Sequence, residues 1–522
     1  MWGREPIPNG ASAGDVWADH AVAVDRFGNA FYTGWFWGTW LCFGSDTLRL
    51  RYNASDAFLA KYDINGNLLW VKQSGDIDPN NSSSVISASV ALDRAGNTYI
   101  TGSFSDSVSF GLFKLGGPSN SYMYLVKYDM NGNVVWAKQK YSAVGGTSVA
   151  VDASANVYVT TDDSLVKYNT FGNLIWSKNS SNANSIALDD SANIYVTGVN
   201  AYLSKYDSSG NLLWNKQPLF SSPSYCTANS VAVDGSMNAY ITGYFVDKVS
   251  FASYILTGDP VSGGRLTIFL VKYDTHGNVC WAKQSYESDS SNWSGYSITC
   301  DTLKSGGGNI LINHEWNQIS FSLPYKLIFL NDTMKWPTYH HKGDTIPDTV
   351  VGYYQSADAL IHFDSSGKIT CKTLFSEGNE DDMDGIGVDP SGKYLYLGGD
   401  IYDTTAFGPD TLVYEYDMPF IARWQPCNEQ IPEIINKTEI KSTEVELYPN
   451  PNPGNFTLSL QGVSEKAQIT IYNILGEQVE HAPLNATTTQ IKMGNKTEGL
   501  YLYRVITEKG NLIGEGKFVI EK

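Results

Sequence analysis

The sequence contains no long hydrophobic segment and few charged residues. Charged side chains make up 17% of its 522 residues, and no run reaches the roughly 18 apolar residues that a transmembrane helix requires. The six cysteines are scattered and form no C-x-x-C pair, so the spacing of a zinc site is absent. Cys280 and Cys371 occupy strand-like positions and are predicted to fill small spaces in the core. These absences exclude a helical membrane protein and a zinc module.

Basic residues are fewer than acidic ones. The chain has 36 Lys and Arg against 54 Asp and Glu, which gives a formal net charge of −18. Such a polyanion repels phosphate backbones, so neither nucleic acid nor membrane insertion is predicted. No H-E-x-x-H, G-x-S-x-G or P-loop motif is present, and no cofactor is predicted.

A two-part phrase repeats along residues 1–427. Its first half reads Ser-Val-Ala-Leu-Asp-x-x-Gly-Asn-x-Tyr-x-Thr-Gly, and its second half reads Phe-Leu-x-Lys-Tyr-Asp-x-x-Gly-Asn-Leu-x-Trp-x-Lys-Gln. In each half, alternating apolar residues flank an Asp-x-x-Gly-Asn corner, which indicates a β-hairpin. Two hairpins give four strands, the unit of a β-propeller blade. The first-half Asp recurs at Asp25, Asp93, Asp152, Asp189, Asp234, Asp301 and Asp389.

The seventh copy lacks its last strand. Residues 420–424 match the start of the second half-phrase, but no Gly-Asn-Leu-x-Trp follows them. Residues 1–4, which include Trp2, instead match the outer strand at residues 70–72. We therefore predict an all-β, seven-bladed β-propeller that its N-terminal strand closes, leaving no open sheet edge.

The length of the copies varies at one face of the predicted disc. Successive Asp markers lie close together between Asp152 and Asp189 and far apart between Asp301 and Asp389, whereas the hairpin corners stay short. The variable connections all emerge on the same side, and binding residues usually collect on such loops. The phrase resembles the bacterial seven-bladed β-propeller repeat family across residues 1–427, which implies a propeller but no single activity.

A second unit follows the repeats. Residues 428–446 are charged, lack the phrase and are predicted to be a linker. Residues 447–522 contain short alternating strands with Gly and Pro turns, which predicts a small Ig-like β-sandwich. This block closely resembles the C-terminal sorting domain of the type IX secretion system of Bacteroidetes. The residues that carry the resemblance are Tyr448, Pro449, Asn450, Pro451, Gly454, Phe456, Tyr472, Gly476, Gly499, Tyr501 and Lys517.

The sorting-domain resemblance implies a location and a partner. It implies contact with the type IX secretion machinery, and secretion or display on the outer-membrane surface. Such cargo also needs an N-terminal export signal, and residues 1–6 contain no apolar segment of that kind. We expect the export signal to lie outside this sequence, and a cytoplasmic protein with this tail is the alternative.

Three tryptophans are the candidate ligand-binding residues. Trp35, Trp37 and Trp40 follow the second strand of the first copy, and Phe36 between them aligns with Phe104 and is predicted to lie in the core. Strand alternation places Trp35 and Trp37 on the opposite face. There they could stack on sugar rings or pack between blades.

An acidic connection is a candidate Ca²⁺ site. Asp381, Asp382 and Asp384 supply oxygen ligands but lack the positional pattern of a known calcium loop. A solvated acidic loop is the alternative interpretation.

The sequence as a whole predicts a secreted or surface-displayed, non-catalytic, monomeric propeller that binds a glycan or a protein through its loop-rich face. Two alternatives remain. One is a secreted carbohydrate-active hydrolase or lyase with its site at the mouth of the propeller channel. The other is a structural or adhesive surface component.

Overall fold

The computed structural model consists of β-strands, with no helix among the residues that it describes. Those residues are 16–17, 22–37, 40–43, 46–50, 55–75, 84–117, 121–180, 182–220, 225–258, 266–287, 292–300, 307–315, 326–329, 332–335, 358–375, 382–389, 394–401, 404–407, 410–413, 418–424, 445–460, 466–473, 478–484, 488–494, 496–507 and 512–521. Within them, no helix is present that could cross a membrane. The chain divides into two compact units, residues 1–437 and 438–522.

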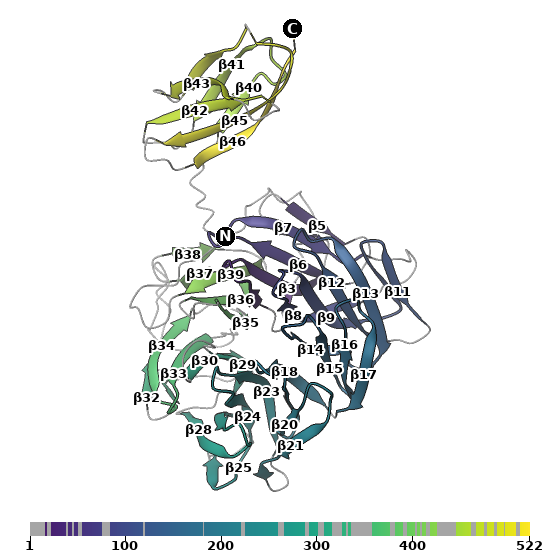
Figure 1. Ribbon diagram of the computed structural model, residues 1–522. Helices are drawn as coiled ribbons and strands as arrows, with labels where there is room; N and C mark the ends of the chain where they lie inside the picture. Colours follow the sequence, from purple (N-terminus) through teal and green to yellow (C-terminus); the bar gives the residue numbers. More distant parts are fainter. Residues whose placement is uncertain are drawn as a thin grey trace. The chain divides into compact units, whose positions relative to one another are not determined.

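The first unit is built from successive antiparallel sheets that follow one another around a common centre, the arrangement of a β-propeller (Figure 1). The innermost strands are β2 (Val22–Val24), β8 (Val85–Leu92), β14 (Gly146–Val151), β18 (Ala183–Leu188), β23 (Cys226–Val233), β29 (Asn292–Cys300) and β35 (Asp382–Val388). The second strands are β3 (Ala30–Trp37), β9 (Thr98–Phe104), β15 (Val157–Thr161), β19 (Ile194–Gly198), β24 (Ala239–Phe245), β30 (Gly307–Glu315) and β36 (Leu395–Ile401).

The outer half of each sheet completes the meander. The third strands are β6 (Ser55–Tyr62), β12 (Tyr122–Tyr128), β16 (Ser164–Tyr168), β20 (Leu203–Tyr206), β27 (Thr267–Tyr273), β33 (Asp358–Asp364) and β39 (Met418–Trp424). The outermost strands are β7 (Leu68–Gln73), β13 (Val134–Tyr141), β17 (Leu174–Asn179), β21 (Leu212–Lys216), β28 (Val279–Glu287) and β34 (Ile369–Phe375). The short strand β1 (Val16–Trp17) pairs with the far end of β3.

The first sheet packs against the last. Strand β2 contacts both β8 and β35, and the other innermost strands contact one another in chain order. The Tyr32 hydroxyl donates to the Gly399 carbonyl at 2.9 Å, and the Tyr396 hydroxyl donates to the Gly28 carbonyl at 3.0 Å. Among the described strands, the last sheet contains β35, β36 and β39. The predicted closing strand with Trp2 lies outside the described residues.

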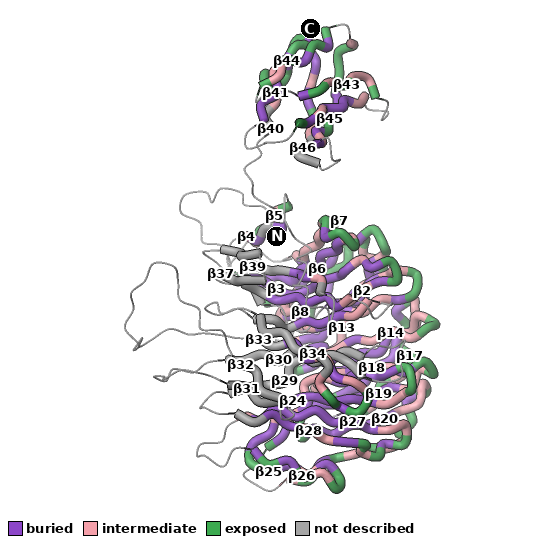
Figure 2. Tube along the Cα trace, turned by 90° about the vertical axis from the view of Figure 1, so that its left-hand side faces the viewer, coloured by how far each residue is buried: buried purple, intermediate pink, exposed green. Residues whose placement is uncertain are grey.

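The recurring Asp and Asn residues hold the short turns, as the sequence predicts. In the turn between β8 and β9, Asp93 Oδ1 accepts the backbone N–H groups of Ala95 and Asn97, both at 2.9 Å. Asp93 Oδ2 accepts the Asn97 amide at 2.7 Å and the Tyr99 hydroxyl at 3.0 Å. Gly96 supplies the left-handed residue, with φ 84°. These turns lie together along one side of the unit, which we call the turn end (Figure 2); the opposite end is the loop end.

A second contact, the Trp–turn joint, ties four of the described sheets to the next one in the chain. The Trp136 indole N–H on β13 donates to the Thr170 carbonyl in the turn after β16 at 3.1 Å, and Lys127 Nζ donates to the same carbonyl at 3.3 Å. Gly172 in that turn has φ 75°, and a Cβ added there would lie 2.9 Å from the Trp136 ring. The same joint links Trp70 to Met130, Trp214 to Thr275, and Trp281 to Ser365.

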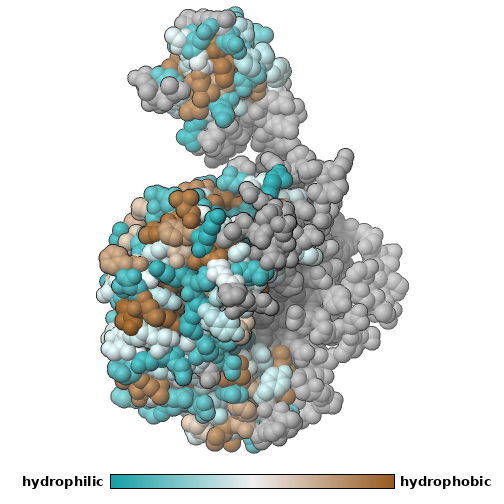
Figure 3. Space-filling view, turned by 90° about the vertical axis from the view of Figure 1, so that its right-hand side faces the viewer, coloured by the Kyte–Doolittle hydropathy of each residue, from teal (hydrophilic) through white to brown (hydrophobic). Residues whose placement is uncertain are grey.

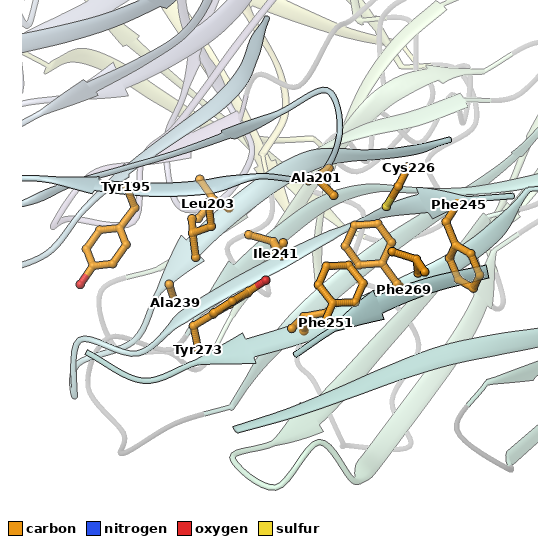
Figure 4. Close-up of a cluster of buried hydrophobic side chains, with 14 of the residues drawn as sticks. Tyr195, Ala201, Leu203, Cys226, Ala239, Ile241, Phe245, Phe251, Phe269 and Tyr273 are labelled. Atoms are coloured by element: carbon orange, nitrogen blue, oxygen red, sulfur yellow. The ribbon is translucent and has the colours of Figure 1, made fainter. Parts of the chain in front are cut away.

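Apolar side chains fill the space between neighbouring sheets. Tyr195 and Leu203 from one sheet meet Ile241, Phe269 and Tyr273 from the next in a single buried cluster (Figure 4). All five are at most 2% exposed. Their burial supplies the main favourable term for stacking the sheets.

Parts of the connections between second and third strands fold into accessory hairpins. They are β4 (Trp40–Phe43) with β5 (Asp46–Arg49), β10 (Ser107–Phe110) with β11 (Phe113–Gly116), β25 (Lys248–Phe251) with β26 (Tyr254–Thr257), β31 (Lys326–Phe329) with β32 (Asp332–Lys335), and β37 (Thr404–Phe407) with β38 (Asp410–Val413). Figure 1 shows β5, β11 and β25 at the outer margin of the unit. The prediction that all variable connections form one loop-rich face is therefore corrected.

An outer-strand glutamine holds the hairpins β4–β5, β10–β11 and β25–β26 in place. Gln139 Oε1 accepts the Gly116 N–H at 2.7 Å, and its Nε2 donates to the Gly116 carbonyl at 3.0 Å. Gln284 holds Thr257 in the same way, at 2.8 and 2.6 Å. A short strand, β22 (Leu219–Phe220), pairs with β25 on the other edge. The glutamine side chain thus continues the sheet, because its amide accepts and donates hydrogen bonds in the pattern of a backbone amide.

The free cysteines of the described residues are Cys226, which is buried, and Cys280, which is exposed. The prediction that Cys280 fills core space is wrong. Cys280 precedes Trp281 on an outer strand, and because successive side chains alternate, it lies on the opposite face from the buried ring.

The second unit consists of two antiparallel sheets around one core. One sheet contains β40 (Val445–Tyr448), β41 (Asn455–Leu460) and β44 (Thr488–Lys492), and the other contains β43 (Gln478–Leu484), β42 (Ala467–Tyr472), β45 (Gly499–Thr507) and β46 (Leu512–Ile520). Phe456, Ile469 and Phe518 are buried between them.

Candidate functional site

The candidate tryptophans lie at the loop end of the first sheet. Trp37 is the last residue of β3, pairs with Ser55 and is 52% exposed. Phe36 is fully buried in the core, as predicted. Trp35 and Trp40 are partly buried. Of the three candidates, Trp37 is therefore exposed, whereas Trp35 and Trp40 are partly buried.

The face that carries Trp35 and Trp37 looks toward the next sheet. On this face of β3, the Thr33 hydroxyl lies 2.8 Å from the Ser87 hydroxyl on β8, and Phe31 packs into the cluster of the second sheet. Strand alternation puts Trp35 and Trp37 on the same side. This location fits packing between sheets for Trp35, while Trp37, at the strand end, remains accessible.

A second exposed aromatic residue lies at the loop end of β13. Tyr141 is 61% exposed, and its ring meets that of Tyr122 edge to face at 6.3 Å. Tyr122 stacks in turn on the buried ring of Phe104 at 5.3 Å. The exposed ring is thus supported by a series of aromatic contacts that reaches into the core.

Charged and hydroxyl groups lie on the face of β13 opposite the Tyr141 ring, because Lys140 directly precedes Tyr141 in the strand. Lys140 Nζ donates to Asp163 Oδ1 at 3.2 Å and to the Ser164 hydroxyl at 2.9 Å. Hydrogen bonds from Ser164, Thr161 and Lys140 hold the pKa of Asp163 below its usual value, so the carboxylate stays charged near neutrality. These groups flank the strand end that carries Tyr141 from the side of the next sheet.

A third exposed aromatic residue precedes β23. Tyr225 is 46% exposed and meets Tyr244 edge to face at 6.1 Å. Burial and the neighbouring Tyr244 raise the pKa of Tyr225, so its hydroxyl remains a neutral donor and acceptor at physiological pH. Tyr244 occupies the place in its copy that Trp35 occupies in the first copy.

Sequence reasoning identified Trp37 but missed Tyr141 and Tyr225. Tyr141 stands where the first copy has Gly75, two residues after the recurring Gln. Tyr225 lies in a variable connection. Both positions lie just beyond the phrase, where the copies differ and the repeat gives no signal.

The described side chains contain no group of three His, Cys, Asp or Glu that could hold an ion, and the side chains of the acidic candidates do not belong to that described set. Asp381 lies outside the described residues. Asp382 and Asp384 lie in β35, where only the backbone is described.

The sorting residues of the second unit divide into a buried scaffold set and an exposed set. Asn450 Oδ1 accepts the Val519 N–H at 2.9 Å, and Asn452 Oδ1 accepts the Gly454 N–H at 2.8 Å. Phe456 and Tyr501 are buried against Phe518, at 4.6 and 5.6 Å between ring centroids. The exposed members are Tyr448, Pro449, Asn450, Pro451, Gly499 and Lys517, Tyr472 is partly buried, and Gly476 lies outside the described residues.

Several solved structures resemble this chain at low sequence identity. BamB from Moraxella catarrhalis is 12% identical, with a TM-score of 0.35 and coverage of 74% of this chain and 96% of that one. PorZ, a surface component of the type-IX secretion system of Porphyromonas gingivalis, is 9% identical, with a TM-score of 0.27 and coverage of 96% and 81%. Likeness at this level carries no information about activity.

The similarity to curated and family sequences is local. An endo-acting ulvan lyase from Formosa agariphila is 28% identical over 88 residues, which are 17% of each chain. The matched segment is therefore a small fraction of that enzyme's length. Residues 446–521 match the model described as the secretion system C-terminal sorting domain. These residues are a type IX sorting domain, and the chain is exported to the cell surface or the extracellular space.

Proposed function

We propose that this protein is a non-catalytic, surface-exposed β-propeller that binds a glycan at its loop end. The observation that carries the proposal is the set of exposed aromatic side chains Trp37, Tyr141 and Tyr225 at that end. Aromatic planes cover the apolar C–H faces of sugar rings while their polar edges stay hydrated.

The surroundings of these residues support a binding role. Tyr141 and Tyr225 are each braced by a second tyrosine, so little side-chain freedom is lost on binding. Lys140 and Asp163 add hydrogen-bonding groups at the same end of the sheets, on the face of β13 opposite the Tyr141 ring. Export to the cell exterior places such a surface where glycans occur.

A glycan-binding screen with the full chain tests this proposal. Trp37→Ala and Tyr141→Ala should each weaken binding about tenfold or more, the loss that follows from about 1–2 kcal/mol of aromatic contact. Phe27→Ala is the matched control, because Phe27 is 62% exposed in the turn between β2 and β3, at the turn end. Equal loss in the control, or binding that is insensitive to both loop-end variants, would contradict the proposal.

The same material distinguishes the alternative functions. A polysaccharide that is shortened, with new reducing ends or unsaturated products, would identify a hydrolase or lyase in place of a binding protein. Binding to a protein on an array, without binding to any glycan, would indicate that the ligand of the loop end is a protein. Absence of any ligand would favour a structural or adhesive surface component.

We further propose that the propeller has seven blades in residues 1–427, closed by the N-terminal strand, with a linker at 428–446 and an Ig-like sandwich at 447–522. The cyclic contact between β2 and β35 supports this count. Arg423 on β39 also donates to the Ile64 carbonyl of the first sheet at 2.8 Å, in the manner of the recurring lysine. Deletion of residues 1–6 should lower the melting temperature, and an unchanged value would argue against closure.

A further inference from the structure

The turn end of the outer strands carries an uninterrupted series of exposed aliphatic side chains. Each of four successive outer strands begins with one or two large apolar residues that are about half exposed. We call this set the apolar belt: Leu69, Val135, Leu174, Ile175, Leu212 and Leu213. Soluble monomers rarely leave apolar patches of several hundred square ångströms open, so such a surface indicates an interaction site.

The Trp–turn joints connect the parts of the belt. Trp70 reaches the turn that contains Met130, which is 54% exposed, and Trp136 reaches the turn that contains Phe171. The belt therefore continues from sheet to sheet over indole rings and turn residues. Figure 3, which faces this rim, shows hydrophobic side chains in successive patches with hydrophilic ones between them.

The belt is confined to part of the ring. At the positions that correspond to Leu69, the next two outer strands have Cys280 and Thr370, and their turns carry Thr275, His276, Ser365 and Ser366 in place of Met130 and Phe171. A scaffold requirement would apply to every copy. The restriction to four neighbouring sheets therefore points to a partner that covers this sector.

We propose that the apolar belt is the contact surface for a second copy of this chain. The six belt side chains together with Met130 and Phe171, all about half exposed or more, offer on the order of 600 Å² of apolar area. Polar atoms between them bring the covered surface close to the roughly 800 Å² per partner of a stable interface. A symmetric dimer uses the same patch on both copies.

Local charge permits this pairing despite the net charge of −18 on each chain. Each of the four outer strands has a lysine two residues after its tryptophan, and the adjoining turns contribute a carboxylate in three of the four sheets. The residues are Lys72, Lys138, Lys178 and Lys216 against Asp63, Asp129 and Asp207. Positive and negative groups alternate along the belt, so two copies in opposite directions meet without net repulsion and with opposite charges facing.

The proposed dimer leaves the candidate ligand surface free. The belt lies at the turn end, whereas Trp37, Tyr141 and Tyr225 lie at the loop end. A two-fold assembly through the belt therefore presents two loop ends at once. Two linked sites raise the avidity for a repetitive ligand without any new contact.

Sedimentation velocity of the full chain tests the proposal over protein concentrations from about 1 to 100 μM, where a micromolar dimer dissociates. The wild-type protein is expected at twice 57.4 kDa at the upper end of the range. The double variant Ile175→Thr/Leu213→Thr should behave as a 57.4 kDa monomer, with the dimer at least about 100-fold weaker. Thr keeps a β-branched side chain in the strand and is the natural residue at position 370.

The control variant is Leu219→Thr, which changes a side chain that is 75% exposed outside the belt and should leave the dimer intact. A second double variant, Leu69→Thr/Val135→Thr, tests the other end of the belt, and thermal melting checks that each variant folds. A wild-type monomer at every concentration would overturn the proposal. So would a dimer that both double variants retain while they fold normally.

Discussion

Substitution of Gly172 by alanine tests whether the Trp–turn joint holds neighbouring sheets together. A Cβ at Gly172 would lie 2.9 Å from the Trp136 ring and 2.7 Å from Lys138 Cε. The lysine stem can move, but Trp136 is only 6% exposed and is fixed by its bond to the Thr170 carbonyl. The new methyl group must therefore displace the ring or the turn.

Gly96→Ala is a matched control for this experiment. Gly96 has φ 84° and Gly172 has φ 75°, so both variants place alanine in the left-handed region at a cost of about 1–2 kcal/mol. A Cβ at Gly96 meets nothing within 4 Å. Overpacking against Trp136 should add about 1–3 kcal/mol in the Gly172 variant alone.

Urea unfolding of the full chain, followed by tryptophan fluorescence, measures the difference between the two variants. We expect Gly172→Ala to lower the midpoint clearly more than Gly96→Ala. Adding Trp136→Leu to Gly172→Ala should reduce that extra loss, because the clash then disappears. Two glycine variants that agree within about 0.5 kcal/mol would refute the joint as a stabilising contact.

Three further predictions follow from other contacts. Gly398→Thr introduces the residue found at the equivalent positions Thr33 and Thr101. It should destabilise the propeller by about 1–3 kcal/mol, since a Cβ there lies 2.6 Å from Val22 and 2.9 Å from the Tyr32 ring. Val22→Ala should relieve part of the loss, and a neutral effect in thermal melting would contradict the packing of the first sheet on the last. Gln139→Glu removes the donor to the Gly116 carbonyl and should speed hydrogen exchange in β10–β11, while Gln217→Glu, at an exposed equivalent position, should change nothing; equal effects would reject the glutamine clamp. Burial first and the nearby Asp93 second raise the pKa of Tyr99, and burial raises that of Tyr202 to about 12. The fold favours the protonated phenols, so their contribution to stability is complete below about pH 10 and is lost as the pH rises through their folded pKa values. In that pH range the melting temperature should fall while the tyrosinate absorbance rises. Ionisation of these phenols at lower pH without loss of structure would contradict their burial.

The repeated phrase predicted much of the architecture because its residues form contacts with residues that are close in the sequence. Asp93, Asn97 and Gly96 close a turn that depends only on nearby residues, and such chemistry is readable from spacing. The propeller-like succession of sheets and the sorting domain at residues 446–521 were therefore predictable.

The accessory hairpins and the exposed aromatics were harder to predict. Phe110 and Leu115 are buried only because the hairpin folds back on its own sheet, which is a tertiary contact with no local period. A shared spacing, Phe43 to Leu48, Phe110 to Leu115 and Phe251 to Leu256, was the available sign. Tyr141 and Tyr225 lie outside the phrase, where comparison between copies gives no alignment.

The Trp–turn joint also has a consequence for how such a protein changes over evolutionary time. Each joint is made between an indole that one copy provides and a turn carbonyl that the following copy provides. A duplicated copy would carry both halves and could insert between two existing ones with its partners already in place. The gene can therefore lengthen by whole copies without new interface mutations. Ring size in such a lineage would be limited by closure at the ends, where Val22 must fit against Gly398.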